Sequence, residues 1–310
     1  MTVYDCFPFF NENDLLELRI NQHWNFVDKF IIVEAGESHT GVKKLFNFDH
    51  ERFKKYSSKL TYVNFDNFKE EINKNLNLLD WYSTQDRTSR GQNTDDWLRD
   101  HFQGNYPIKI LKELEAEDTD LIYISALDEI LNEEAFKKGQ SIFLDKDKLY
   151  PLKSGDRPIQ NHEGQLVFTR PAFGFSLDMF VYKFNLFCKQ ISVAQLTEFS
   201  VLKQMLPSTM RALSMNTHPS IPDAGWHFTF LDNTDGEKVL EKQKSWAHSR
   251  DQLPNQKIKF THTSKQEALE RLFLDYKVKK TDITEKTHPK YLIDNLDEYK
   301  NYIFDGECTF

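Results

Sequence analysis

The sequence predicts an α/β protein with a mostly parallel central sheet, helices on both of its faces and a helical C-terminal segment. In the first 140 residues, short runs of β-branched and aromatic residues alternate with amphipathic stretches, which is typical of strand–helix–strand units. A chain of 310 residues is long enough to bury a sizeable core. The stretch 237–310 is charged and amphipathic. We therefore expect one domain over 1–236, with 237–310 packed on it as a helical segment.

The individual elements follow from local patterns. The runs VYDCFPFF, KFIIVEA, SKLTYVNF and DLIYIS predict strands at 3–10, 29–35, 58–65 and 120–125. Helices are predicted at three places: after a cap at Asn13 or Asp14, from about Thr94 with a break at Pro107, and from a cap at Asn132 to an end at Gly139. Residues 150–230 mix glycine, proline, asparagine and aromatics, which indicates loops and short strands. Amphipathic helices are expected in 237–246 and 265–278.

Bulk composition excludes several classes of protein. The net charge of −8 argues against a general nucleic-acid binder, because neutralising phosphates dominates that affinity. Cys6, Cys188 and Cys308 are too widely spaced for a zinc pattern, and we expect reduced thiols. The N-terminus does not resemble a signal peptide, and no stretch reaches the ~20 apolar residues of a membrane span. We expect a cytoplasmic protein, with peripheral membrane contact left open and the oligomeric state undetermined.

Two acids fall at the ends of predicted strands: the apolar run of the second strand ends at Glu34, and Asp128 lies just after the fourth strand. Ligands of doubly wound sheets bind outside the carboxyl ends of the strands. Asp128 and Glu129 could hold Mg²⁺ or Mn²⁺ against a diphosphate, since hard cations prefer oxygen ligands. The alternative is a pair of surface acids before a helix, which the helix N-terminus favours. Glu34 could accept hydrogen bonds from a ribose or a base, or could lie in a solvated loop.

Other residues have two interpretations each. In AGWHFTF, His227 could complete a metal site or be a packed histidine, and Trp226 could stack on a sugar or belong to the core. Lys43 and Lys44 could meet phosphate as point charges or be solvated. Arg99 could bind a diphosphate or pair along its own helix with nearby acids.

Taken together, these motifs resemble glycosyltransferase family 17. The residues that carry the resemblance are YDCFPFFNENDLLELRI, IIVEAGESHTG, WLRDHFQGN, AGWHFTF and the tail HPKYLIDNLDEYKNYIF. The resemblance implies a GT-A type nucleotide-sugar fold and inverting, metal-dependent transfer of N-acetylglucosamine from its UDP donor to a glycan or glycolipid. It makes Asp128 the last acid of an Asp-x-Asp metal motif and Glu34 a uridine-contacting acid. It also places His227 and Trp226 in the active-site cleft, lined or supported by Arg99 and Gln103.

The chain departs from the family pattern at Ala126. The family carries an acid there, and this chain reads SALDEI. A natural variant with weak metal use is one explanation. An engineered Asp-to-Ala change that silences the enzyme is the other, and we favour it because the surrounding residues are intact. Either way we expect poor catalysis. Gly104 and Leu98 also differ from the family, which makes donor and acceptor details less secure.

An inverting transfer needs a base across the sugar from the diphosphate. Asp223, Glu129 and Asp178 are the candidates, with Asp223 favoured because it adjoins AGWH. The loop GDRPIQNHEGQLVFTRPAFGF is expected to select the acceptor, because variable loops carry specificity. A bacterial or viral protein that builds a surface glycan in the cytoplasm fits these features, with action at the inner membrane face left open. The alternative function is a non-catalytic protein that holds a nucleotide sugar or glycan. A nucleotidyltransferase fits less well, because FPFFNEND lacks a Gly-rich basic loop.

Overall fold

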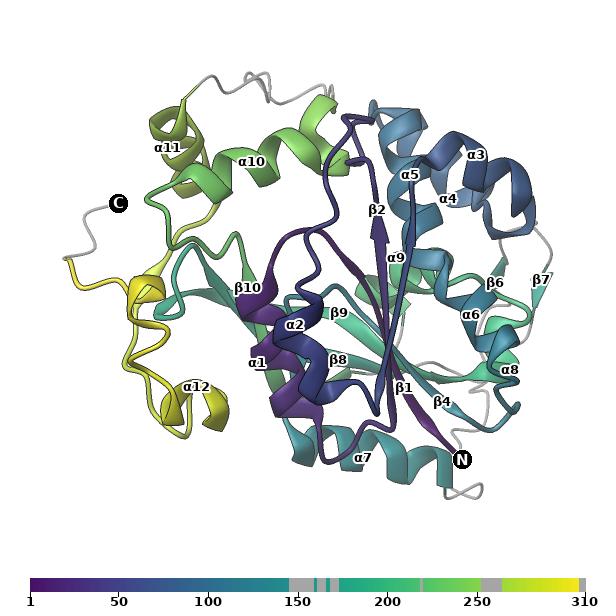
Figure 1. The fold of residues 1–310 in the computed structure, drawn as a ribbon, viewed down its shortest axis with the longest axis horizontal. Helices are drawn as coiled ribbons and strands as arrows, with labels where there is room; N and C mark the ends of the chain where they lie inside the picture. The colour runs from purple at the N-terminus through teal and green to yellow at the C-terminus, as the bar shows by residue number, and fades with distance from the viewer. Residues whose placement is uncertain (145–158, 161–165, 168–172, 218–219, 252–263, 307–310) are drawn as a thin grey trace.

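The protein is described by a computed structural model that covers residues 1–144, 159–160, 166–167, 173–217, 220–251 and 264–306. A mixed sheet runs through the molecule in the order β3-β2-β1-β4-β9-β8-β10-β5, and β11 (Lys279–Lys280) pairs with β9. Helices cover both of its faces (Figure 1). The predicted α/β class is therefore confirmed.

The parallel half of the sheet comes from the first strands of the chain. Its members are β1 (Val3–Phe9), β2 (Lys29–Ala35), β3 (Leu60–Phe65) and β4 (Leu121–Ile124). β1 lies in the middle and pairs in parallel with both β2 and β4. All four strands agree with the sequence prediction. Their carboxyl ends meet at one edge of the sheet, which is where a ligand site is expected.

Alternate residues of these strands pack into two hydrophobic cores, one on each face of the sheet. The first core cluster includes Phe7, Phe30 and Tyr123 and lies under the helices α1, α7 and α12. The second core cluster includes Cys6 and Ile31 and lies under α5, α6, α8 and α9. A strand whose two faces are both covered is buried throughout. This explains why these strands read as continuous apolar runs in the sequence.

The other half of the sheet is largely antiparallel and was not predicted. It consists of β5 (Glu129–Leu131), β8 (Phe173–Val181), β9 (Leu186–Glu198) and β10 (Ser220–Thr229). The expectation of loops and short strands over 150–230 is wrong for the long strands β8, β9 and β10. Only the two-residue strands β6 (Ile159–Gln160) and β7 (Leu166–Val167) fit it among the described residues. Most of the predicted acceptor loop, 155–158, 161–165 and 168–172, lies outside the described residues.

Helices follow the strands of the parallel half and begin near the predicted positions. Those of the first 150 residues are α1 (Asn13–His23), α2 (His50–Phe53), α3 (Phe68–Lys74), α4 (Trp81–Ser89), α5 (Thr94–Asn105), α6 (Pro107–Glu113) and α7 (Glu133–Leu144). Short 3-10 turns lie at Lys54–Tyr56 and Leu76–Leu78. The predicted break at Pro107 is confirmed, because α6 begins there with proline in its first turn.

Two helix ends differ from the prediction. The N-cap of α1 is Glu12, which makes no side-chain capping bond, rather than Asn13 or Asp14. Asn132 does cap α7, with Oδ1 accepting from the backbone of Ala135 at 2.8 Å. Gly139 does not end α7. A Cβ there would lie 3.2 Å from Phe175, so this glycine allows the helix to approach the sheet.

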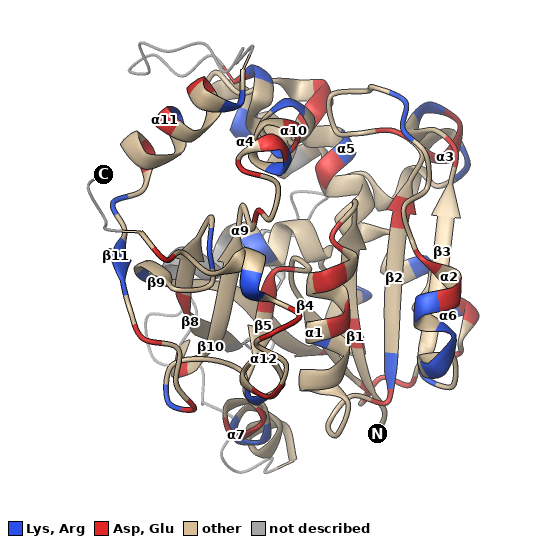
Figure 2. Ribbon diagram, turned by 60° about the vertical axis from the view of Figure 1, so that its left-hand side comes forward, with Lys and Arg blue, Asp and Glu red and all other residues tan. Residues whose placement is uncertain are grey.

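The C-terminal segment is helical, as expected. After α8 (Phe199–Leu202) and α9 (Pro207–Thr217), it contains α10 (Glu237–Ser245), α11 (Lys265–Asp275) and α12 (Lys290–Asp294), with 3-10 turns at Ala247–Arg250 and Lys300–Tyr302. A third core cluster joins Met179 and Val181 of β8 to Val239 of α10 and Leu272 of α11. Acidic and basic residues are interspersed along α10 and α11 (Figure 2). Among the described helices, none combines the length and apolarity that a bilayer span needs.

Candidate active site

The turn after β4 is held by one buried arginine. Arg19 of α1 donates from Nη1 to the carbonyl oxygens of Ala126 (2.7 Å), Leu127 (3.0 Å) and Glu129 (2.8 Å). Its other nitrogens bind the carboxylate of Asp5 at 2.6 and 3.0 Å. A planar guanidinium can serve several acceptors in fixed directions. Arg19 therefore fixes the path of the main chain that presents the acidic side chains of this turn.

The turn brings three of the predicted site residues together. Ligand atoms of Asp128, Glu129 and His227 all lie within 4.8 Å of one another. β5 and β10 pair so that His227 is opposite Glu129, and the Phe228 amide donates to the carbonyl oxygen of Asp128 at 2.8 Å. The sequence prediction that Asp128 and His227 share a site is consistent with this arrangement.

Gly225 permits the close approach of β10 to β5. Its φ of +147° is one that L residues rarely adopt, and a Cβ would lie 2.1 Å from the carbonyl oxygen of Ile130. Residues with a side chain cannot occupy this position without displacing backbone. The glycine of AGWHFTF therefore has a structural reason that depends on contact between strands, not on a ligand.

Each carboxylate of this cluster already faces a cation. Lys242 of α10 lies 3.0 Å from Oδ2 of Asp128, and Nε2 of His227 lies 3.4 Å from Oδ1. Burial alone would raise the pKa of Asp128, but Lys242 and His227 hold that pKa well below its ordinary value. Arg211 of α9 binds both oxygens of Glu129, at 2.8 Å each. Burial would lower the pKa of Arg211, but Glu129 keeps it raised.

These contacts do not fit an open divalent-metal site. A Mg²⁺ or Mn²⁺ ion needs carboxylate oxygens that are free to coordinate it. Oδ2 of Asp128 faces an ammonium, both oxygens of Glu129 accept from a guanidinium, and the position of the first motif acid is Ala126. Glu129 also accepts from the Ala126 amide at 2.8 Å. The expected metal ligands are near one another, but their charge is already compensated by the chain itself.

A cavity opens beside this cluster. Its lining comes from the loop after β1, from the turn after β4, from α10 and from the C-terminal segment, and it includes Asn11, Glu12, Asp14, Asp128, Phe228, Phe230, Lys238, Lys242, Tyr299 and Tyr302. Carboxylates and ammonium groups therefore line the same cavity together with aromatic rings. Such a mixture can hold the sugar and the phosphates of one ligand.

Glu34 lies at the end of β2 in a separate network. It is fully buried, and it accepts from Nζ of Lys44 (2.5 Å), from the amides of Asn47 (2.7 Å) and Phe48 (3.2 Å), and from the hydroxyl of Tyr62 (2.8 Å). Glu34 and Lys44 thus fold the loop 44–48 over the end of the strand. Their roles toward uridine and phosphate stay predictions.

Gln103 and Arg99 of α5 lie near the Glu34 network and contact the loop that follows β2. Gln103 donates to the carbonyl oxygen of Val33 at 2.9 Å and bonds with Nε2 of His39 at 2.9 Å. Arg99 donates to the carbonyl oxygen of His39 at 3.0 Å and lies 3.3 Å from Asp96. Both side chains fix the loop after β2 from the side of α5. These contacts hold the loop in place, which is compatible with the supporting role that the resemblance allowed for Arg99 and Gln103.

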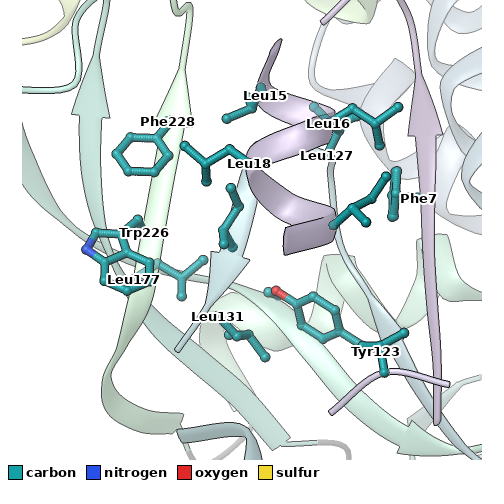
Figure 3. Close-up of a cluster of buried hydrophobic side chains, with 14 of the residues drawn as sticks. Phe7, Leu15, Leu16, Leu18, Tyr123, Leu127, Leu131, Leu177, Trp226 and Phe228 are labelled. Carbon is teal, nitrogen blue, oxygen red and sulfur yellow. The ribbon is translucent and has the colours of Figure 1, made fainter. Parts of the chain in front are cut away.

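Trp226 and Asp223 lie away from the acidic cluster. Successive strand residues point to opposite faces, so Trp226 faces away from His227 and packs in the first core cluster (Figure 3), where its indole nitrogen donates to the carbonyl oxygen of Thr287 at 2.7 Å. Asp223 is exposed, with φ +50°, beside a register shift of β10. It accepts from Gln190 at 3.2 Å, and Gln190 also bonds Asp178.

The sequence prediction missed Arg19, Arg211 and Lys242. A signal exists for Arg19, which follows Leu15 by four positions and Leu16 by three and so lies on the apolar stripe of its helix. Arg211 and Lys242 gave no comparable signal, because a cation on a polar helix face is usually solvated. Their partners become visible only when α9 and α10 are placed against β5 and β10.

A mixed α/β sheet with acidic side chains at the carboxyl ends of its parallel strands is compatible with a glycosyltransferase. Residues 1–141, just under half of the chain, match the model of the family described as glycosyltransferase family 17. The match contains Glu34, Arg99, Gln103 and the turn with Asp128, and ends before His227 and Lys242. The mixed α/β sheet is consistent with a GT-A-like fold. A search of curated proteins found no match.

Proposed function

We propose that the protein is an inverting glycosyltransferase that moves a sugar, expected to be N-acetylglucosamine from UDP-GlcNAc, to a hydroxyl of a glycan or glycolipid. One observation carries the proposal. Asp128, within the range that matches the family, lies at the carboxyl end of the parallel strands together with His227 and beside a cavity. The proposed place of action is the cytoplasm of a bacterium or a virus-infected cell.

The proposed reaction is one displacement. The acceptor hydroxyl oxygen bonds to the anomeric carbon of the sugar while the bond from that carbon to the phosphate oxygen breaks, and UDP leaves with the electron pair. The acceptor proton passes to a carboxylate. Mn²⁺ or Mg²⁺, expected from the sequence, would neutralise the departing diphosphate only if Lys242 left Asp128.

Asp223 suits the role of base better than Glu129. Both oxygens of Glu129 accept from Arg211, so a further proton would have to compete with a guanidinium. Asp223 is exposed, and its positive φ at a β-bulge is the kind of local strain that functional sites retain. Asp223 is four residues from His227 along β10, roughly 13 Å in an extended strand. This separation leaves room for a sugar between base and diphosphate.

The test is to measure binding of UDP, UDP-GlcNAc, UDP-glucose and UDP-galactose by calorimetry, followed by release of UDP with glycan acceptors. Binding of UDP-GlcNAc in preference to the other sugars, with slow turnover, is expected. Binding without turnover, even after Ala126→Asp, would favour the second candidate, a nucleotide-sugar-binding protein without catalysis. Ala126 and the compensated carboxylates are the observations that favour this candidate. Failure to bind any UDP compound would overturn both.

A further inference from the structure

We propose that Lys242 is a built-in cation that binds the diphosphate of the donor in place of a divalent metal. This inference rests on the proposed function and concerns the same site. Nζ of Lys242 lies 3.0 Å from Oδ2 of Asp128, the carboxylate expected to hold the metal. The ammonium therefore takes the place next to Asp128 that a metal ion would need.

The charges of the cluster support this assignment. Asp128 faces Lys242, and Glu129 faces Arg211. An Asp at position 126 would add a third carboxylate, but this chain has Ala126. A divalent ion added to two compensated carboxylates would bring two uncompensated positive charges into a largely buried place, at a large cost in free energy. The chain as it stands needs no metal to balance its acids.

Lys242 is held in place by its surroundings. Its helix is anchored by the buried Val239 and by Gln243, which donates to the carbonyl oxygen of Ala268 at 3.0 Å. Nζ of Lys242 also lies 5.2 Å from the centre of the Phe230 ring, within the range of a cation–π contact. A side chain positioned on two sides in this way loses little further freedom when a ligand binds.

The ammonium also has donors to spare. A lysine carries three N–H groups, and the bond to Asp128 uses one of them. Lys242 lines the cavity beside the cluster, as does Lys238 one turn earlier on α10. Phosphate oxygens that enter this cavity could accept from Lys242 while Asp128 keeps the ammonium in place. Lys238 bonds the hydroxyl of Tyr302 at 3.1 Å and is positioned to add a second positive charge.

The test compares UDP binding by the full chain in EDTA and in MnCl₂, by calorimetry. We expect dissociation constants that agree within about threefold in the two buffers. Lys242→Met should weaken binding in EDTA about tenfold, the change expected from losing one charge-assisted hydrogen bond. Lys242→Arg should keep most of the affinity, because it keeps the charge. Lys244→Met is the matched control, since Lys244 is an exposed residue of the same helix, and it should leave binding unchanged.

Two results would overturn the inference while leaving the proposed function intact: UDP binding that requires Mn²⁺, or unchanged affinity of Lys242→Met in EDTA. Absence of UDP binding in both buffers would instead overturn the proposed function. Lys242→Met leaves Asp128 without its ammonium, so folding is checked by circular dichroism. If that variant does not fold, Asp128→Asn combined with Lys242→Met removes both charges, and it should show the same tenfold loss in EDTA.

Discussion

Nη2 of Arg19 lies 2.6 Å from Oδ1 of Asp5, and neither side chain is exposed to solvent. Asp5 belongs to β1 and Arg19 to α1, and the same guanidinium reaches the carbonyl oxygens of the turn after β4. Burial would raise the pKa of Asp5, but Arg19 and His23 hold it below its ordinary value. One ion pair thus couples the first strand and helix to the turn that carries Asp128.

Replacing Arg19 should destabilise the protein strongly. Arg19→Met leaves Asp5 buried without its guanidinium, and breaking a buried pair costs about 3–5 kcal/mol of unfolding free energy. Urea denaturation measures this change. Arg90→Met is the control, because Arg90 is 68% exposed and pairs with Asp86 on the surface, where such pairs contribute about 0–1 kcal/mol. Equal effects of the two substitutions would show that Arg19 does not organise the turn.

Restoring an acid at position 126 should change both catalysis and metal use. Ala126→Asp would supply the first acid of the motif, and we expect UDP release with Mn²⁺ to rise about a hundredfold through better stabilisation of the leaving diphosphate. Ala126→Asn is the control of similar size without the charge. A rise of the same size in Ala126→Asn, or no rise in Ala126→Asp, would contradict this prediction.

Asp223→Asn should abolish sugar transfer and spare UDP binding. The substitution keeps the size of the side chain and removes its basicity, so only proton removal from the acceptor is affected. It is best made together with Ala126→Asp, so that the starting activity is measurable. Asp178→Asn is the matched comparison, because Asp178 bonds the same Gln190. Transfer that survives Asp223→Asn and is lost in Asp178→Asn would reassign the base.

His23 should make the protein less stable at acid pH. The Leu131 amide donates to Nε2 at 2.9 Å, and Nδ1 lies 2.8 Å from Asp5, an arrangement that fits a neutral ring. Burial lowers the pKa of His23 from its ordinary value of 6.5. Below that pH the unfolded chain binds a proton that the folded chain does not, so the unfolding free energy falls as pH falls.

The corresponding measurement is urea denaturation at several pH values between 7 and 5. His23→Gln should show a smaller fall in unfolding free energy over this window than the unaltered chain. Burial also lowers the pKa values of His101 and His288, so part of the dependence should persist. An identical dependence in the variant would mean that His23 takes up a proton equally well in both states.

The parallel half of the fold was predictable because strands buried on both faces appear in the sequence as continuous apolar runs. β2 was predicted with its observed bounds, and the break at Pro107 follows from the missing amide of proline. β9, in contrast, leaves no such pattern in the sequence. Its residues Lys189 and Gln190 are exposed although they lie within a strand of 13 residues. Backbone pairing with β8 sustains such a strand without an apolar pattern.

The site was predictable only in part, and mainly through its resemblance to a family. Asp128 and His227 come together because β5 pairs with β10, and no local pattern foretells that pairing. Trp226 could stack on a sugar or belong to the core, and it packs in the core because its position on β10 points it to the other face. Lys242 was missed because its partner lies on a different element, far away in the sequence.

Gly225 has a consequence for how this protein can change. With Ile130 oxygen 2.1 Å from where a Cβ would stand, even a methyl group would act as a wedge between the two strands and separate the histidine from the aspartate without touching either. The acids and cations of the site can therefore be exchanged one by one, yet the spacing that they share depends on a residue whose side chain is a single hydrogen.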